Sequence, residues 1–400
     1  MNIKLRRIVA SLLAGAAIGV NIPENGVLYA DAAEIISSGE CGDNASWTLD
    51  SDGLLTISGT GAIADTMFGE TPWDNAAVKK AVIKSGITSI ERTAFNGNEN
   101  MTEIEIADTV TSIGNFAFLG CESLKTVSIP YKVSELGVGV FAFCENLESI
   151  ETDSRSVYLT DEDGILFTKD KKKLICFPKA KDVSTYIIPY GVETIGNSAF
   201  YNCDQLTGVE IPKTVTVLDI DSFAECGGLT SIAIPESVNE IGEYSFSRCE
   251  SLKTVFIYNP DCEIFDGSAT ICNTSEVIDD GTFNITHEGS FSGTVYSYAG
   301  STAQSYAEKY GYNFRAIKSY EFQLGDVNID GAIDALDASL TLMEYASVST
   351  GKPSELDDIE KLAADTDHDG NINALDASYI LSYYAHTATG GKGTFEEFMK

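Results

Sequence analysis

A motif of 23 residues recurs along the middle of the chain and restricts its fold more than any other feature. Full copies start at Met101, Leu124, Val183, Leu206 and Leu229, and weaker copies start at Val78 and Leu252. The shared pattern is L-x-x-I-x-I-P-x-x-V-x-x-I-G-x-x-A-F-x-x-C. A fixed period of about 20–29 residues with a leucine-type strand signal is typical of solenoids, in which each copy stacks on the next.

Three apolar columns run through the copies. Alternation of apolar and polar residues in the first half of each copy predicts a half-buried strand. One copy cannot bury three apolar faces, whereas stacked copies can, so the sequence predicts a β-rich solenoid. The columns are Ile106, Ile129, Ile188, Ile211 and Ile234; Val110, Val133, Val192, Val215 and Val238; and Phe118, Phe141, Phe200, Phe223 and Phe246.

Cysteines form a further column. Neighbouring coils of a β-solenoid lie about 4.7–5 Å apart, so thiols of adjacent copies are close. We interpret the column as packing by small, buried, free thiols beside the phenylalanines, in preference to disulfides or a metal ladder. Zinc is disfavoured because the chain has no C-x-x-C pair and the repeats have no histidine. The column comprises Cys121, Cys144, Cys203, Cys226 and Cys249.

An insertion interrupts the period, because the spacing from Leu147 to Val183 is 36 residues. Residues 151–182 alternate apolar and polar side chains around D-G and K-D-K turns, which predicts β-hairpins. The insertion also carries a basic run, Lys169 and residues 171–173. We interpret this run as a solvated hairpin tip in preference to a binding patch.

Two acidic segments follow residue 319 and lack the 23-residue period. Both fit D-x-[DN]-x-[DN]-G-x5-acid, the calcium loop of an EF-hand, with Asp at the last position. A loop of twelve residues surrounds calcium by directing oxygens at positions 1, 3, 5, 7, 9 and 12 inward, and the sharp turn at position 6 favours glycine. The predicted ligands of two calcium ions are Asp326, Asn328, Asp330, Ala332, Asp334 and Asp337, and Asp365, Asp367, Asp369, Asn371, Asn373 and Asp376.

Two other segments share only the start of that pattern. Residues 50–53 (DSDG) and 161–164 (DEDG) have the opening acids and the glycine. Twelve-residue windows from these points end on Gly61 and Lys172, which cannot close a calcium site. We therefore predict hairpin turns at both places.

The N-terminus resembles an export signal. A basic start is followed by an apolar stretch at residues 8–20 and an A-x-A cleavage site near Ala33, so residues 1–32 are predicted to be a signal peptide of a secreted protein. No other apolar run is long enough to span a bilayer. The net charge of −34 disfavours nucleic acid and anionic membrane surfaces as partners.

The repeats resemble the BspA-like type of leucine-rich repeat, known from bacterial and protozoan surface proteins. On this resemblance the repeats span residues 78–258, with an N-terminal β cap at residues 33–77 and a C-terminal cap at residues 259–318. The implied fold is a leucine-rich-repeat solenoid with β-hairpin caps.

The C-terminal region resembles a dockerin module. Matching helical segments at residues 336–346 and 375–385 follow the two calcium loops, and a connecting helix is predicted at residues 353–364. The resemblance implies a linker at 319–324, a small all-α dockerin at 325–390 and a tail at 391–400, and a scaffoldin cohesin as partner. It also implies a cohesin-binding face in each half, either of which could engage. These faces are Ala335, Leu336, Leu342, Met343 and Ser347, and Ala374, Leu375, Leu381, Ser382 and His386.

No catalytic pattern accompanies these modules. The chain has three histidines, two of them in the dockerin-like region, and no nucleophile elbow or phosphate loop. We therefore expect a non-catalytic, monomeric, extracellular component of a cellulosome, held at the cell surface through a scaffoldin, whose repeats bind a protein or glycan. Two alternatives remain open: a carbohydrate-active enzyme or inhibitor hidden in the repeats, and a host-surface adhesin.

Overall fold

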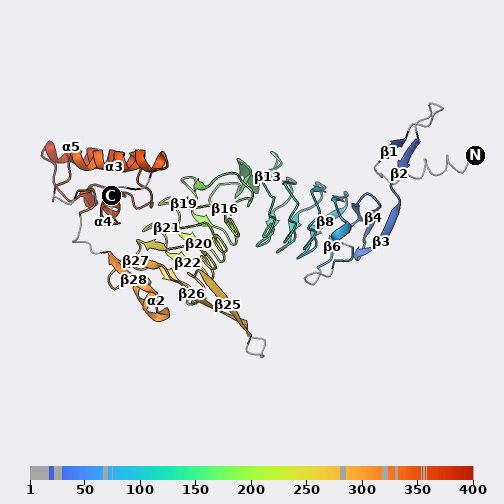
Figure 1. Ribbon diagram of the computed structural model, residues 1–400. Coiled ribbons are helices and arrows are strands. Elements are labelled where there is room, and N and C mark those ends of the chain that lie inside the picture. Colours follow the sequence, from blue (N-terminus) through green and yellow to red (C-terminus); the bar gives the residue numbers. More distant parts are fainter. Residues whose placement is uncertain are drawn as a thin grey trace, which may run out of the picture. The chain divides into compact units, whose positions relative to one another are not determined.

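The computed structural model describes residues 18–21, 29–65, 71–73, 75–279, 285–317, 323–328, 332–352, 354, 356 and 358–399. The chain forms two compact units: Met1–Lys169 with Pro178–Lys181, and Asp170–Phe177 with Asp182–Lys400 (Figure 1). Most of the predicted signal peptide, residues 1–17 and 22–28, lies outside the described residues. Its remaining residues form an antiparallel pair, β1 (Ile18–Asn21) and β2 (Tyr29–Ala32).

The first unit begins with an antiparallel meander and continues as a parallel solenoid. Strands β3 (Ile35–Gly42), β4 (Ala45–Asp50) and β5 (Leu54–Gly59) form the meander, and β7 (Lys80–Ile83) and β9 (Glu103–Ile106) extend the same sheet in parallel. A second sheet contains β6 (Gly61–Ile63), β8 (Ile87–Ile90), β10 (Ser112–Ile113) and β12 (Glu135–Leu136). Strands β11 (Thr126–Ile129) and β13 (Ser149–Thr152) form a parallel pair, and a short 3-10 helix spans Asn75–Ala77. The change from antiparallel to parallel pairing marks the start of the repeats.

The insertion forms one hairpin. Strands β14 (Leu159–Glu162) and β15 (Ile165–Thr168) pair antiparallel around Asp163 and Gly164, both of which have positive φ. Strand β16 (Lys173–Cys176) then pairs parallel with the next repeat strand, β18 (Thr194–Ile195). In the second unit, Lys172 forms an ion pair of 2.6 Å with Glu193, so part of the basic run is neutralised.

The second unit repeats the same architecture. One parallel sheet contains β16, β18, β20 (Val217–Leu218), β22 (Glu240–Ile241) and β24 (Glu263–Ile264). A parallel pair is formed by β17 (Thr185–Ile187) and β19 (Gly208–Glu210), and another sheet by β21 (Ser231–Ile234), β23 (Thr254–Ile257), β27 (Thr294–Tyr298) and β28 (Asn313–Ile317). Paired residues such as Ile195 and Leu218 are 23 positions apart, so each copy forms one coil.

The C-terminal cap combines a hairpin with a β-α-β element. Strands β25 (Thr274–Asp279) and β26 (Ile285–Ser290) pair antiparallel. Helix α2 (Thr302–Tyr310) then connects β27 to β28. Ser301 caps its N-terminus by accepting a hydrogen bond from the Gln304 backbone N–H, and Gly311 ends it in the left-handed conformation.

Stacked aromatic rings fill the core of each unit. In the first unit Trp73, Phe95, Phe118 and Phe141 follow one another with ring centroids 5.3, 5.3 and 5.6 Å apart. In the second unit Phe177, Phe200, Phe223 and Phe246 follow at 5.1, 4.8 and 5.4 Å. Phe177 lies within the predicted insertion but stands 23 residues before Phe200, so it keeps the period of the ladder, although the sequence analysis did not include it in the phenylalanine column.

The cysteine column packs beside these rings. Cys121 and Cys144 are fully buried, and each thiol donates to the carbonyl oxygen of the phenylalanine one coil earlier, at 3.3 and 3.2 Å. Cys226 and Cys249 repeat this contact at 3.1 and 3.2 Å. All nine cysteines fall within the described residues, and all are free thiols. Burial raises the pKa of the Cys176 thiol to about 12.

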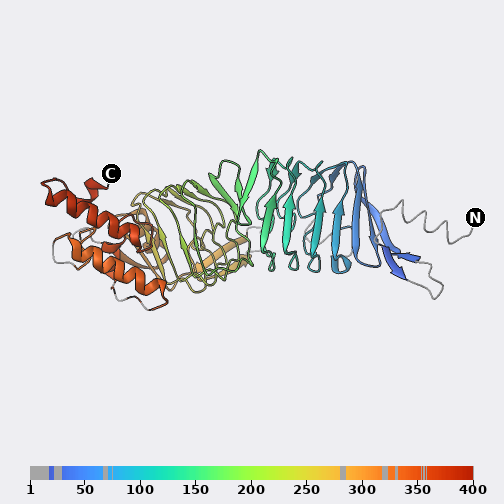
Figure 2. The same ribbon diagram turned by 90° about the horizontal axis from the view of Figure 1, so that it is seen from above.

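The C-terminal region is a small helical module (Figure 2). Its helices are α3 (Ala335–Ser349), α4 (Asp358–Ala364), α5 (Ala374–Ala388) and α6 (Phe395–Phe398). Ile333 and Ile372, at position 8 of the two predicted calcium loops, belong to one hydrophobic core. That core also contains Phe395, so residues that the sequence analysis separated as a tail pack into the module. Within the described part of the chain, no helix combines the length and apolar character needed to cross a bilayer.

Candidate metal centre and docking face

The second acidic loop gathers three carboxylates. One oxygen each of Asp365, Asp367 and Asp369 lies within 4.8 Å of the others, and Asp365 and Asp369 are buried. The loop is folded by its own backbone, because Asp365 accepts hydrogen bonds from the N–H groups of Asp369 and Gly370, both at 3.0 Å. Gly370 has a φ of 87°, as the sharp turn at position 6 requires.

This donor set fits calcium. The buried Oδ1 atom of Asp367 has no hydrogen-bond partner among the described residues. Burial, together with the charges of Asp376 and Asp367, raises the pKa of Asp365 well above its usual range. A divalent cation would offset the mutual repulsion of these carboxylates, and oxygen is the ligand atom that calcium prefers.

The first loop is described in part. Asp326 and Asp337 are buried, and the backbone N–H groups of Asn328 and Asp334 donate hydrogen bonds to Asp337. Ala332 is also among the described residues. Asp330 and Gly331 lie outside the described residues. For the first loop, the predicted carboxylate cluster therefore stays a prediction, which the equivalent residues of the second loop support.

Position 12 closes each loop through hydrogen bonds. Oδ1 of Asp337 accepts from the backbone N–H groups of Val327 and Asn328, at 2.8 and 3.2 Å. Its Oδ2 atom accepts one bond of 2.8 Å from the Asp334 backbone N–H. An ionised carboxylate has about four lone-pair positions, so Oδ2 retains one for a metal. We therefore expect Asp337 to bind calcium through one oxygen.

Asp376 repeats this arrangement in the second loop. Its Oδ1 atom accepts from the backbone N–H and the hydroxyl of Thr366, at 2.8 and 2.9 Å, and its Oδ2 atom accepts from the Asn373 N–H at 2.9 Å. Burial, with the charge of Asp367, raises the pKa of Asp376 to about 6. The two loops therefore use position 12 in the same way.

Each loop also starts a helix. Asp334 and Asn373, at position 9, are the N-caps of α3 and α5, and each accepts a hydrogen bond of 2.7 Å from the backbone N–H two residues later. With Asp337 and Asp376 at the third helical position, both helices begin with a capping box. The side chains predicted to bind calcium at positions 9 and 12 therefore also initiate the helices.

The predicted docking residues lie on the exposed surfaces of α3 and α5. The exposed fractions of Leu336, Leu342 and Met343 are 54%, 42% and 55%. In the other helix, Leu375 and Leu381 are 47% and 44% exposed. Ala335, Ala374 and Ser382 are exposed, and Ser347 and His386 are half-buried. An exposed apolar stripe on a helix whose other face is buried is typical of a partner interface.

Two serines that the sequence analysis did not include lie beside the predicted docking leucines. Ser339 and Ser378 are exposed and lie three residues after Leu336 and Leu375, which places them on the same helix faces. Ser339 donates a hydrogen bond of 2.9 Å to the Ala335 carbonyl oxygen. Their occurrence in both copies of A-L-D-A-S was the signal that could have identified them.

The two faces differ at their C-terminal ends. His386 lies 5.2 Å from the ring of Phe398 in α6, whereas its counterpart Ser347 has a small side chain. Phe395 packs on Tyr383 at 5.1 Å and holds α6 in place. The second face is therefore bordered by α6 at His386.

The two look-alike segments are hairpin turns, as predicted. Asp50 accepts hydrogen bonds from the backbone N–H groups of Asp52 and Leu54, at 3.0 and 2.9 Å, where β4 turns into β5. Residues 161–164 lead from β14 into β15. Shared opening acids therefore do not produce a calcium loop without acceptors at positions 9 and 12.

Comparison with protein families identifies two regions. The model of the BspA type leucine rich repeat region matches residues 66–162 and 173–296, in six copies, which together make up more than half of the chain. The model of the dockerin type I domain matches residues 324–383. A search of curated proteins found no match.

Several solved structures are similar to parts of the chain. A leucine-rich repeat protein from Eubacterium ventriosum is 25% identical, with a TM-score of 0.39 over 59% of this chain and 82% of that one. A leucine-rich cell surface protein from Faecalibacterium prausnitzii is 18% identical, with a TM-score of 0.42 over 72% and 96% of the two chains. The pneumococcal vaccine antigen PcpA is 14% identical, with a TM-score of 0.41 over 71% and 100%.

Proposed function

The chain belongs to the family with BspA-type leucine-rich repeats and carries a type I dockerin domain, and we propose that it is a secreted, non-catalytic component of a cellulosome-type assembly. A dockerin domain implies a cohesin partner and an extracellular or cell-surface location. The family matches identify no catalytic domain. The repeats would then bind the protein or glycan that the assembly recruits.

The matched pair of capped helices carries this proposal. Helices α3 and α5 both have 15 residues, both begin with a capping box, and both expose leucines at equivalent positions. Leu336 and Leu375 both occupy position 11 of a candidate calcium loop. A cohesin could therefore engage either helix through similar contacts, with two calcium ions holding the helix N-termini in place.

Calcium would act on the loops and not on the partner directly. Asp365, Asp367 and Asp369 would hold the ion in the second loop, and Asp376 would join it through one oxygen. Because Asp376 also anchors the first turn of α5, the ion would stabilise the helix that presents the docking face. We expect Asp326, Asp330 and Asp337 to do the same for α3.

A binding experiment tests the docking role. The full chain should bind a recombinant type I cohesin from a scaffoldin panel in excess calcium and lose that binding in EGTA. Asp367→Asn should weaken the calcium-dependent binding, whereas Asp52→Asn, a matched change in the look-alike turn after β4, should leave it unaltered. Equal effects of the two substitutions, or binding that survives EGTA, would refute the role of the loop.

A second experiment tests whether the repeats are catalytic. The full chain is incubated with plant-wall polysaccharides, and the release of soluble oligosaccharides is measured. We expect no turnover. Turnover that one Asp→Asn or Glu→Gln substitution in the repeats abolishes would replace the non-catalytic role with that of a dockerin-delivered enzyme.

A further inference from the structure

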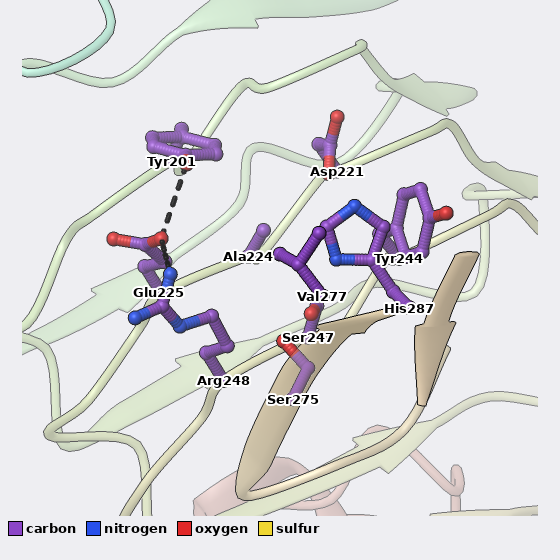
Figure 3. A pocket seen from close by; sticks show the side chains of 10 residues that line it. All are labelled: Tyr201, Asp221, Ala224, Glu225, Tyr244, Ser247, Arg248, Ser275, Val277 and His287. Carbon is purple, nitrogen blue, oxygen red and sulfur yellow. Dashed lines mark hydrogen bonds and ion pairs between the residues drawn. The ribbon is translucent and has the colours of Figure 1, made fainter. Parts of the chain in front are cut away.

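A cavity of about 410 Å³ lies on the second unit, where three successive coils meet the hairpin β25–β26 (Figure 3). Its volume falls in the range of about 300–1,000 Å³ that is typical of small-molecule sites. The coils contribute Tyr201, Asp221, Ala224, Glu225, Tyr244, Ser247 and Arg248, and the hairpin contributes Ser275, Val277 and His287.

The residue before the column cysteine lines the cavity in two successive coils, and in both coils it is charged. In each coil the residue before the column cysteine has a positive φ, for example Gly120 at 69° and Asn202 at 58°. Glu225 and Arg248 occupy the same position with φ values of 59° and 56°. The left-handed conformation costs a residue with a Cβ atom roughly 1–2 kcal/mol, and glycine avoids that cost. Glu225 and Arg248 adopt this conformation as Phe143 and Asn202 do in other coils, so the repeat backbone sets where their side chains start.

One side of the cavity is held by hydrogen bonds. Glu225 accepts from the Tyr201 hydroxyl at 3.2 Å and from the Arg248 guanidinium at 3.0 Å. Figure 3 shows these three side chains together, opposite Tyr244 and His287. An arginine has five N–H donors, so Arg248 keeps donors for a ligand beyond its bond to Glu225.

The other side offers an acceptor and an aromatic wall. Tyr244 and His287 pack edge to face with ring centroids 5.1 Å apart. Asp221 is half-buried, and the described residues supply no hydrogen-bond donor to its carboxylate. Burial, with the nearby charges of Glu243 and Glu225, raises the pKa of Asp221 to about 6. A half-buried carboxylate in this setting would be stabilised by a donor from a ligand.

This combination selects a neutral ligand. An anion would meet Asp221 and Glu225. Among the described residues, the ion pair of Glu225 with Arg248 leaves Asp221 as the lining carboxylate without a partner, and a hydroxyl group can satisfy it. A polyhydroxylated molecule can donate to Asp221, accept from Arg248 and the two serine hydroxyls, and lay its C–H face on Tyr244. We propose that this cavity binds a neutral sugar unit of a glycan, which makes the repeats a carbohydrate-recognition surface.

This inference rests on the proposed function in one respect, since it names the ligand class of the repeats. The full chain is tested by isothermal titration calorimetry against neutral cello-, xylo- and manno-oligosaccharides. We expect one of these to bind, and we expect Asp221→Asn and Arg248→Met each to weaken binding by about tenfold, as for loss of a hydrogen bond to a charged group. Asp261→Asn, at an exposed position outside the cavity, is the control.

The outcomes separate this inference from the docking role. All variants should bind cohesin as the unmodified chain does, and circular dichroism should show that they are folded. If no neutral oligosaccharide binds, or if Asp221→Asn and Asp261→Asn have equal effects, the sugar site is wrong while the docking role stands. Binding of a lysine-rich peptide or of an acidic sugar, lost in the same variants, would also overturn the assignment to a neutral ligand.

Discussion

Truncation of one docking leucine should have little effect on cohesin binding, whereas truncation of both should have a clear effect. The perturbations are Leu336→Ala, Leu375→Ala and the double variant. Leu→Ala removes three carbons, worth about 2.4 kcal/mol when they are fully withdrawn from water. Because Leu336 and Leu375 are only 54% and 47% exposed, roughly half of that, about 1.2 kcal/mol, is gained when a partner covers them.

Because the module has two candidate cohesin-binding faces, the measured loss of affinity depends on whether one or both leucines are replaced. A loss of about 1.2 kcal/mol corresponds to about eightfold weaker binding in the double variant. If both faces bind equally well, each single variant keeps one intact binding mode. The observed dissociation constant of a single variant then rises by only about 1.8-fold.

Calorimetric titration with cohesin in excess calcium measures all three variants. Ile36→Ala serves as the control, because Ile36 is 58% exposed on β3, in the other unit. A single variant that shows the full loss of the double variant would refute the equivalence of the two faces. Loss from Leu336→Ala alone would assign binding to α3, the helix whose face is not the one that α6 borders at His386.

Three further predictions concern the loops, the core and the cavity. Chelation by EGTA should lower the melting temperature of residues 325–390. Calcium at 100 times its dissociation constant would stabilise the native state by about 2.7 kcal/mol per site, and EGTA removes that contribution. An unchanged calorimetric transition would contradict the metal assignment. Replacement of the fully buried Phe118 by Ala should destabilise the first unit by about 3–5 kcal/mol, measured by urea denaturation, and a loss below about 1 kcal/mol would contradict a continuous ring ladder. Asp221→Asn should raise the melting temperature at about pH 8 and leave it nearly unchanged at about pH 4. Burial and the charges of Glu243 and Glu225 raise the pKa of Asp221 to about 6. Ionisation of Asp221 therefore lowers the stability of the native state as the pH rises through about 6, and the substitution removes that loss. Equal effects at both pH values would show that its charge is not destabilising.

The ladders were predictable because repetition fixes them. Phe118, Phe200 and Phe223 occupy the same position in three copies of the repeat. The recurrence of an apolar residue at that position predicted that all three side chains are buried. Phe177 joins the second ladder from within the predicted insertion, 23 residues before Phe200. The sequence analysis missed this periodic signal because no full copy of the repeat surrounds Phe177.

The acidic cluster of the second loop was predictable for another reason. The predicted ligands lie within twelve consecutive residues, so local spacing alone brings Asp365, Asp367 and Asp369 together. The double use of Asp337 and Asp376 as loop closure and capping residue was not predicted. It depends on where the helix starts, and the structure places that start at positions 334 and 373.

The cavity could not be predicted from any motif. Tyr201 and His287 lie 86 positions apart in the sequence, and only the stacking of coils against the hairpin brings them to one site. In a solenoid the consensus positions maintain the stack, so the positions that vary between copies are available for binding. Glu225 and Arg248 occupy such a variable position, which is Gly120, Phe143 or Asn202 in other coils. The ion pair of 3.0 Å between their side chains, which come from successive coils, gives this part of the solenoid a polar wall that the consensus residues do not supply.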